Sequence, residues 1–254
     1  MLVSKGKSNA RRTSFSHHSE APSLKLVSDN PGSASKKEVV LKARTPGQRF
    51  YIKELLEGSA PFVIATGPAG TGKTYAAVLY AIKLLRTGKI KKIIITRPNV
   101  GAGDDLGFLP GDVDSKMAPW MNPILDAFHE YYSAYEVDLM IKAKTIEMAP
   151  LVFMRGRTLK NAIVIGDEMQ NATPEQMKMF LTRIGEGSRY IVTGDMEQWD
   201  REQVASGVSG LNDLMNRLAK RDPEAPTAFA VFPLGARDVV RHEAIPEVLE
   251  AYAA

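Results

Sequence analysis

The apolar residues of this chain gather in short runs separated by longer stretches with helical spacing. Residues 61–66 form a β-branched and aromatic run of the length of a buried strand. Residues 74–85 then have one apolar helical face, made of Ala77, Val78, Ala81, Ile82 and Leu85. Further strands are expected at 92–96, 161–168, 189–195 and 227–232, and helices at 112–135, 211–218 and 246–252. This alternation predicts an α/β domain with a mostly parallel sheet flanked by helices, in which 112–135 is a helical insertion.

A complete phosphate-loop sequence, Gly-x-x-x-x-Gly-Lys-Thr, lies between the first expected strand and the first expected helix. Its residues, with the position that follows them, are Gly67, Pro68, Ala69, Gly70, Thr71, Gly72, Lys73, Thr74 and Tyr75. A Gly-rich turn lets backbone N–H groups converge on phosphate at a helix N-terminus, where the helix dipole favours an anion. Lys73 supplies a charge for the β- and γ-phosphates, and the Thr74 hydroxyl supplies a ligand for Mg²⁺. The strand–loop–helix order favours this interpretation over a glycine turn without a ligand.

Two acidic residues, Asp167 and Glu168, follow the apolar run 161–166. At the carboxyl end of a parallel strand they would lie beside the phosphate loop. Asp167 is therefore expected to hold Mg²⁺, and Glu168 to orient or deprotonate the attacking water. The alternative is a solvated strand end. The pair favours hydrolysis over phosphoryl transfer.

Gln198 follows the strand-like run 189–195, which ends with Gly194 and Asp195. An amide at this edge of the sheet could hydrogen-bond the γ-phosphate and lose that partner on hydrolysis, which would turn a chemical step into a movement. The alternative is a loop that uses Gly-Asp only to turn.

Eight ordered blocks between Thr45 and the last residues together resemble the PhoH family. They are Thr45-Pro46-x-Gln48, the phosphate loop, Thr96-Arg97-Pro98, Leu106-Gly107-Phe108-Leu109-Pro110-Gly111, Met154-Arg155-Gly156-Arg157-Thr158, Asp167-Glu168-x-Gln170-Asn171, Thr173-Pro174-Glu175-Gln176-Met177-Lys178 and Asp238-Val239-Val240-Arg241-His242. Two residues depart from the family pattern: Gly166 stands where a larger apolar residue is usual, and Met169 where a small one is usual. Both departures concern packing and leave the acids in place.

The resemblance implies an ATPase with a single RecA-like P-loop core, related to superfamily 1 helicases, that uses ATP and Mg²⁺. Gln48 is similar to the glutamine that reads adenine in helicases, since an amide can both donate and accept. Its alternative is a polar turn residue. Arg97 resembles the family's Thr-Arg-Pro arginine, a cation for phosphate of either nucleotide or nucleic acid. The expected partners are therefore ATP and RNA or single-stranded DNA.

By size, residues 45–254 make one ATPase domain. A motor helicase pairs two such lobes across the nucleotide, and too few residues follow Asp195 for a second. We therefore expect a ring-shaped or other head-to-tail homo-oligomer, with a hexamer as one closed form, in which a neighbour inserts an arginine at the γ-phosphate. The candidate arginine fingers are Arg155, Arg157, Arg183, Arg237 and Arg241. For each of them the alternative is a surface or interface salt bridge.

Residues 1–44 differ from the domain because they are basic and poor in apolar residues. They hold nine Lys and Arg against three acidic residues. Such a composition predicts a disordered tail. Its cations could contact nucleic-acid phosphates, or the tail could only solubilise the domain. The aromatic residues of the insertion could stack on unpaired bases or belong to the core: Trp120, Phe128, Tyr131, Tyr132 and Tyr135.

Composition narrows the expected cellular location, and the sequence as a whole leaves three functions open. The chain has no cysteine and no apolar stretch long enough to span a bilayer, so we expect a cytoplasmic protein of a bacterial cell, or of the host cytoplasm if phage-encoded. The first function is an ATPase that remodels or unwinds RNA or single-stranded DNA. The second is a P-loop kinase or GTPase, although the base-reading Asn/Thr-Lys-x-Asp motif of a GTPase is not found. The third is a nucleotide-gated scaffold.

Overall fold

The computed structural model describes residues 37–98, 113–198, 207–241, 243–245 and 251, without the side chains of residues 113–119. Its centre is a six-stranded sheet in the order β3-β2-β4-β5-β1-β6, in which every strand pair is parallel. The strands are β1 (Phe62–Thr66), β2 (Lys92–Arg97), β3 (Ile146–Pro150), β4 (Ala162–Gly166), β5 (Arg189–Gly194) and β6 (Phe229–Pro233). The prediction of an α/β, RecA-like fold with a parallel sheet is therefore confirmed.

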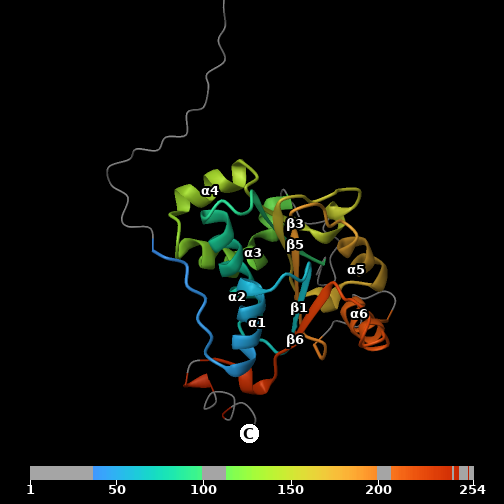
Figure 1. Ribbon diagram of the computed structural model, residues 1–254. Helices are drawn as coiled ribbons and strands as arrows, with labels where there is room; N and C mark the ends of the chain where they lie inside the picture. The colour runs from blue at the N-terminus through green and yellow to red at the C-terminus, as the bar shows by residue number, and fades with distance from the viewer. Residues whose placement is uncertain (1–36, 99–112, 199–206, 242, 246–250, 252–254) are drawn as a thin grey trace, which may run out of the picture. The chain divides into compact units, whose positions relative to one another are not determined.

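Helices cover both faces of the sheet (Figure 1). One side carries α1 (Pro46–Glu57), α2 (Lys73–Arg86), α3 (Val113–His129) and α4 (Ala134–Lys142), and the other carries α5 (Pro174–Leu181) and α6 (Gly210–Ala219). Three single turns of 3₁₀ helix follow strands or loops: η1 (Leu151–Met154), η2 (Met169–Asn171) and η3 (Ala236–Asp238). Both faces of the sheet are thus covered, as parallel sheets require.

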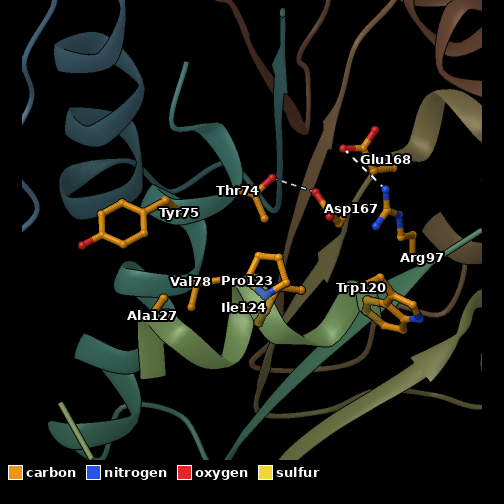
Figure 2. Close-up of a pocket in the computed structure, with 10 residues that line it drawn as sticks. All are labelled: Thr74, Tyr75, Val78, Arg97, Trp120, Pro123, Ile124, Ala127, Asp167 and Glu168. Carbon is orange, nitrogen blue, oxygen red and sulfur yellow. Dashed lines mark hydrogen bonds and ion pairs between the residues drawn. The ribbon is translucent and has the colours of Figure 1, made fainter. Parts of the chain in front are cut away.

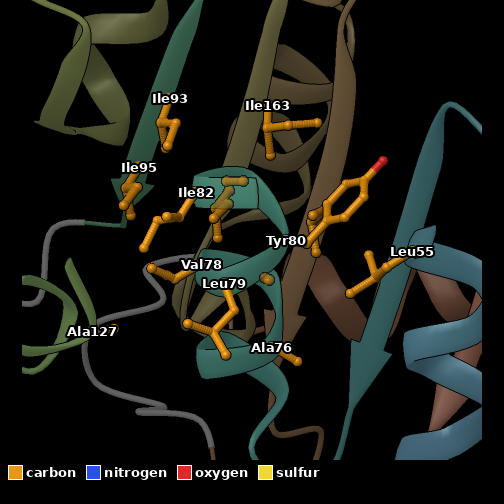
Figure 3. Close-up of a cluster of buried hydrophobic side chains, with 14 of the residues drawn as sticks. Leu55, Ala76, Val78, Leu79, Tyr80, Ile82, Ile93, Ile95, Ala127 and Ile163 are labelled. Carbon is orange, nitrogen blue, oxygen red and sulfur yellow. The ribbon is translucent and has the colours of Figure 1, made fainter. Parts of the chain in front are cut away.

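Alternate residues of each strand enter two separate cores. In β1, Val63 and Ala65 pack with the helices α1 to α4, whereas Ile64 packs with the side of α5 and α6. Figure 3 shows the first core around α2, where Ile82 lies among side chains of the neighbouring strands. Burying an isoleucine of this kind is worth about 1.5–3 kcal/mol. The carboxyl ends of the strands are thereby fixed on one edge, which carries the loops discussed below.

Local capping explains where two helices begin, α1 and α4, which the hydrophobic pattern did not predict as separate elements. α1 begins because the Thr45 side chain accepts from the N–H of Gln48 and Pro46 occupies the first turn. The expected insertion 112–135 is two helices, because Ser133 and Glu136 form a capping box that starts α4. The expected helical insertion is present, and it consists of α3 and α4.

Residues 37–44, expected as the end of the basic tail, pack on the domain. Val39 is buried, and its carbonyl accepts from Lys83 Nζ at 3.1 Å. Residues 1–36, the block 106–111, His242 and the greater part of the expected helix 246–252 lie outside the described residues. Within the described part of the chain, no helix combines the length and the apolar character needed to cross a membrane.

The two departures from the family pattern lie against each other. A Cβ atom at Gly166 would lie 3.0 Å from Met169 Cγ and 2.9 Å from Phe180 Cε1. Met169 and Phe180 are fully buried. The methionine therefore occupies space that a side chain at position 166 would need, and the departure at one position accommodates the departure at the other.

We expect the penalties of substitutions at these two positions to be non-additive. Gly166→Ala should destabilise the protein by about 1–3 kcal/mol through overpacking, and Met169→Ala by about 2–5 kcal/mol through a cavity. In the double variant the new methyl group enters that cavity, so the penalty of Gly166→Ala shrinks. Urea unfolding of all four proteins measures the coupling. Gly235→Ala is the matched control, because a Cβ there meets no atom within 4 Å; additive penalties would contradict the shared space.

Candidate nucleotide site

Residues 67–74 connect β1 to α2 and form the predicted loop. Gly67, Gly70 and Gly72 have φ angles of 140°, 87° and 75°, in the region that favours glycine. A Cβ atom at Gly67 would also lie 2.1 Å from the carbonyl oxygen of Leu234, so no side chain fits there. Gly72 precedes α2 without a side-chain cap, which leaves the first N–H groups of the helix to an anion.

Lys73 is held against this loop. It is only 8% exposed, and its Nζ donates to the carbonyl of Pro68 at 3.2 Å. Thr71 Oγ1 donates to the same carbonyl at 2.9 Å. Behind the lysine, the Tyr51 hydroxyl donates to the Lys73 carbonyl at 3.1 Å, and burial raises the pKa of Tyr51 so that the hydroxyl stays protonated. The cation therefore lies where phosphate groups on the loop would meet it.

The first turn of α2 and the carboxyl ends of β4 and β5 bring oxygen atoms together beside the loop. Thr74 Oγ1, in the first turn of α2, donates to Asp167 Oδ1 at 2.7 Å (Figure 2). Thr193 Oγ1, from β5, donates to the same carboxylate oxygen at 2.7 Å. Asp167 follows β4 and is only 7% exposed. The sequence placed Thr74 and Asp167 together correctly, but it did not indicate Thr193.

These oxygens suit Mg²⁺. The ion prefers oxygen ligands and keeps several waters, so it usually takes one or two protein groups together with phosphate oxygens. Thr74 Oγ1 and the Asp167 carboxylate provide such a set, and the contact between them shows that both reach one point. Among the described residues, no group of three or more His, Cys, Asp or Glu could hold a metal ion by itself.

Glu168 adopts a left-handed conformation, with φ of 52°. Such a conformation costs a non-glycine residue about 1–2 kcal/mol. The hydrogen bonds of Gln170 to Glu168 and to the residues after β5 offset this cost. The Gln170 Nε2 group donates to Glu168 Oε2 and, at 3.3 Å, to the carbonyl of Gln198. Gln170 Oε1 accepts from the N–H of Asp195 at 3.0 Å. A buried glutamine thus ties the end of β4 to the end of β5 and fixes the Glu168 carboxylate.

Arg97, at the end of β2, approaches the same glutamate. Its Nη2 lies 3.8 Å from Glu168 Oε1, and its Nε is buried without a hydrogen-bond partner. Both side chains are about one-third exposed or less, so the pair is partly screened by solvent. Arg97 therefore holds Glu168 while keeping an unused donor.

A cavity of about 360 Å³ opens between these charged groups and helix α3 (Figure 2). One wall is polar, and the other comes from apolar side chains of α2 and α3. Its lining residues are Thr74, Tyr75, Val78, Arg97, Trp120, Pro123, Ile124, Ala127, Asp167 and Glu168. The Tyr75 hydroxyl points away from the acids and donates to Glu130 at 2.9 Å. Tyr75 thus lines the cavity with its ring, and its hydroxyl lies away from Asp167.

Gln48 contacts the phosphate loop from the outside. Its Nε2 donates to the carbonyl of Thr71 at 3.0 Å, and its Oε1 accepts from the N–H of Arg44 at 2.8 Å. Both functions of the amide are therefore engaged with backbone. The sequence expected Gln48 near the nucleotide, and the structure places it directly against the loop.

Asp238 anchors the same region from the other end of the domain. Its carboxylate accepts from Thr45 Oγ1, from the N–H of Gly235 at 3.0 Å and from the N–H of Gly47 at 3.1 Å. The hydrogen bond from Thr45, with the two backbone donors, holds the pKa of Asp238 below its usual range. Asp238 is thus kept ionised, and it fixes the start of α1 beside the loop.

Gln198, expected as a γ-phosphate sensor, is exposed at the carboxyl edge beyond β5. Its contact with the site is through its backbone carbonyl, which Gln170 binds. The glutamine whose side chain binds Glu168 in the structure is Gln170, and not Gln198. The signal for it was the Asp-Glu-x-Gln spacing, in which the turn after β4 brings the glutamine back toward the glutamate.

The five candidate arginines have different surroundings. Arg157 forms a two-pronged ion pair with Glu147, and this hydrogen bond lowers the pKa of the carboxyl group. Arg183 donates to the carbonyl of Met179 at 3.2 Å. Arg241 donates to the carbonyl of Ala69 at 3.4 Å, in the phosphate loop of its own chain. In the described part of the chain, only two of the five have exposed side chains without a partner: Arg155 and Arg237.

The aromatic residues of the insertion also divide. Phe128 is fully buried, and Tyr131 and Tyr132 pack against the same core. Trp120 lines the cavity, and Tyr135 is 72% exposed. The core interpretation therefore applies to three of the five.

An all-parallel sheet with a phosphate loop between β1 and α2, and an acidic pair after β4 that contacts it, defines a P-loop NTPase. The model of the family described as PhoH-like protein matches residues 40–253. The chain belongs to the PhoH family, as its sequence blocks predicted.

Named relatives agree. The PhoH-like protein of Bacillus subtilis (strain 168) is 45% identical over 213 residues, which are 84% of this chain and 64% of that protein. The PhoH-like protein of Synechocystis sp. is 46% identical over 214 residues, 84% of this chain and 62% of that one. The chain thus spans less than two thirds of their length. Among solved structures, the chain is similar to the Hef helicase domain of Pyrococcus furiosus. The match covers 76% of this chain and 38% of the Hef chain, at 13% identity and a TM-score of 0.43.

Proposed function

We propose that this protein binds ATP with Mg²⁺, hydrolyses it, and couples hydrolysis to the binding, remodelling or unwinding of RNA or single-stranded DNA. The observation that carries the proposal is the contact of Thr74 with Asp167, with Glu168 as the next residue. It joins the phosphate-binding loop to Asp167, and the carboxylate of the next residue, Glu168, can act on water. Membership of the PhoH family supports the binding of a nucleotide.

Each residue then has a separable role. The N–H groups of the loop and Lys73 bind the phosphates, while Thr74 and Asp167 hold Mg²⁺. When bound, the metal neutralises charge on the β- and γ-phosphates. Glu168, positioned by Gln170, orients water and accepts its proton. Gln48 lies next to the loop, where it would exchange its backbone partners for adenine.

Arg97 provides the link to a polymer. In the structure it contacts Glu168, and its Nε has no partner. A phosphate group that draws Arg97 away would release Glu168 to act on water. Phosphate contacts with arginine are charge-assisted and often two-pronged, so they compete well with a 3.8 Å ion pair. Polymer binding and hydrolysis would thereby be coupled.

We further propose that the active form is a ring-shaped homo-oligomer. Of the five candidate arginines, Arg155 and Arg237 are exposed without a partner in the described part of the chain, so they are the candidates to act in a neighbour's site. Arg241 already lies on its own loop. Sedimentation of the active enzyme tests this: we expect a mass of several chains, and full turnover by a single chain would exclude the ring.

Lys73 and Glu168 should fail in different ways. We expect Lys73→Ala to weaken nucleotide binding about 10- to 100-fold, since a hydrogen bond to a charged group is worth about 1.5–3 kcal/mol. Glu168→Gln should keep binding and lower turnover about 10²- to 10⁴-fold, because the carboxylate acts in the transition state. Titration with a fluorescent ATP analogue and phosphate release measure the two effects. Lys91→Ala, an exposed lysine, is the control; equal loss of affinity in both variants would contradict the role of Glu168.

The proposed coupling predicts that polymer accelerates hydrolysis. We expect RNA or single-stranded DNA to raise ATP turnover several-fold at low salt, with the effect fading as salt rises. Phosphate release with and without each polymer measures it. Turnover that neither polymer changes would favour a nucleotide-gated scaffold, and transfer of phosphate to a small acceptor would indicate a kinase.

A further inference from the structure

A rigid turn projects apolar side chains from the carboxyl end of β3. In η1, Leu151 and Met154 are buried, whereas Val152 and Phe153 are 52% and 53% exposed. In a 3₁₀ helix, residues three apart lie on the same side, so anchoring Leu151 and Met154 directs the two residues between them outward.

The base of this turn is fixed by charge. Arg157 pairs with Glu147 of β3 through two hydrogen bonds, one of 2.9 Å, and Lys92 donates to the same carboxylate at 3.3 Å. Arg155, two positions earlier, is exposed, and its side chain forms no hydrogen bond or ion pair with the described residues. One arginine therefore supports the turn, and the other presents an unpaired cation two positions after Phe153.

The turn lies beside the hydrolytic site. Arg97 is the register partner of Pro150, the residue immediately before η1. Adjacent strands are about 4.8 Å apart. Arg97 in turn contacts Glu168. A ligand on η1 would therefore lie close to the arginine that holds the glutamate.

We propose that Phe153 and Arg155 form a contact for single-stranded polynucleotide, with an unpaired base stacked on the Phe153 ring and a phosphate bound by Arg155. The proposal rests on the proposed coupling to RNA or single-stranded DNA and names where the strand is held. A base needs only one ring face, and its phosphate needs one cation. Val152 extends the apolar edge beside the ring.

The size of the surface favours a nucleic acid over a protein partner. A stable protein interface buries about 800 Å² on each side, with an aromatic or aliphatic cluster at its centre. Here two apolar side chains project from a single turn, with a cation beside them. The contact is therefore expected to be tolerant of sequence, since every base has a face that can stack.

Binding of labelled oligonucleotides by the full chain tests the proposal. The probes are fluorescein-labelled oligo(dT) and oligo(U) of about 20 nucleotides, followed by anisotropy over a range of salt concentrations. Phe153→Ala should weaken binding about 10-fold or more, and Phe153→Tyr should preserve it, because the ring remains. Arg155→Gln should reduce the slope of log affinity against log salt by about one, because one phosphate contact is lost. If Arg155 instead acts as an arginine finger in a neighbouring subunit, Arg155→Gln should leave this slope unchanged.

Two control variants make the result decisive. Phe50→Ala removes a more exposed aromatic on α1, and Arg217→Gln removes an exposed arginine on α6; both should bind as the wild type does. Normal binding by Phe153→Ala and Arg155→Gln would overturn this site while leaving polymer coupling intact. Failure of the wild type to bind either oligonucleotide would overturn the coupling itself. A change in assembly mass with unchanged binding would identify the turn as a subunit contact and also overturn the proposal.

Discussion

The hydrogen bond between Thr74 and Asp167 is the interaction on which the site depends. It joins residues 93 positions apart, one in the first turn of α2 and one after β4. In the sheet, β5 lies between β4 and β1, and its Thr193 binds the same carboxylate oxygen. Strand order, and not proximity in sequence, therefore brings the helix and the acid together, since parallel strands end at one edge.

Beside this contact, the structure holds Glu168 in a conformation that the residue alone would not choose. Gln170 and Arg97 approach its carboxylate from the ends of two different elements. Gln170 also binds backbone at the end of β5, so a shift of that strand end would reach the glutamate. Geometry of this kind lets a small displacement at the edge of the sheet change the position of one carboxylate.

Features with a local cause could be predicted from the sequence. The central strands follow from their apolar runs, and β5, observed at 189–194, ends one residue before the predicted run 189–195 does. β3 was missed because Glu147 interrupts its apolar pattern, although Arg157 and Lys92 neutralise that charge in the fold. The binding role of Asp238 was not predictable, because its partner Thr45 lies 193 positions away. Gln170 was visible only as part of a family block, since its role depends on the neighbouring strand.

The phosphate loop is completed by residues from the far end of the domain. The N–H of Leu234 donates to the carbonyl of Thr66, the Leu234 carbonyl packs on Gly67, and the N–H of Val240 donates to the carbonyl of Gly70. During synthesis, residues 67–74 leave the ribosome well before residues 234–240 do. The nascent chain must therefore carry an unfinished loop until residues 234–240 have emerged.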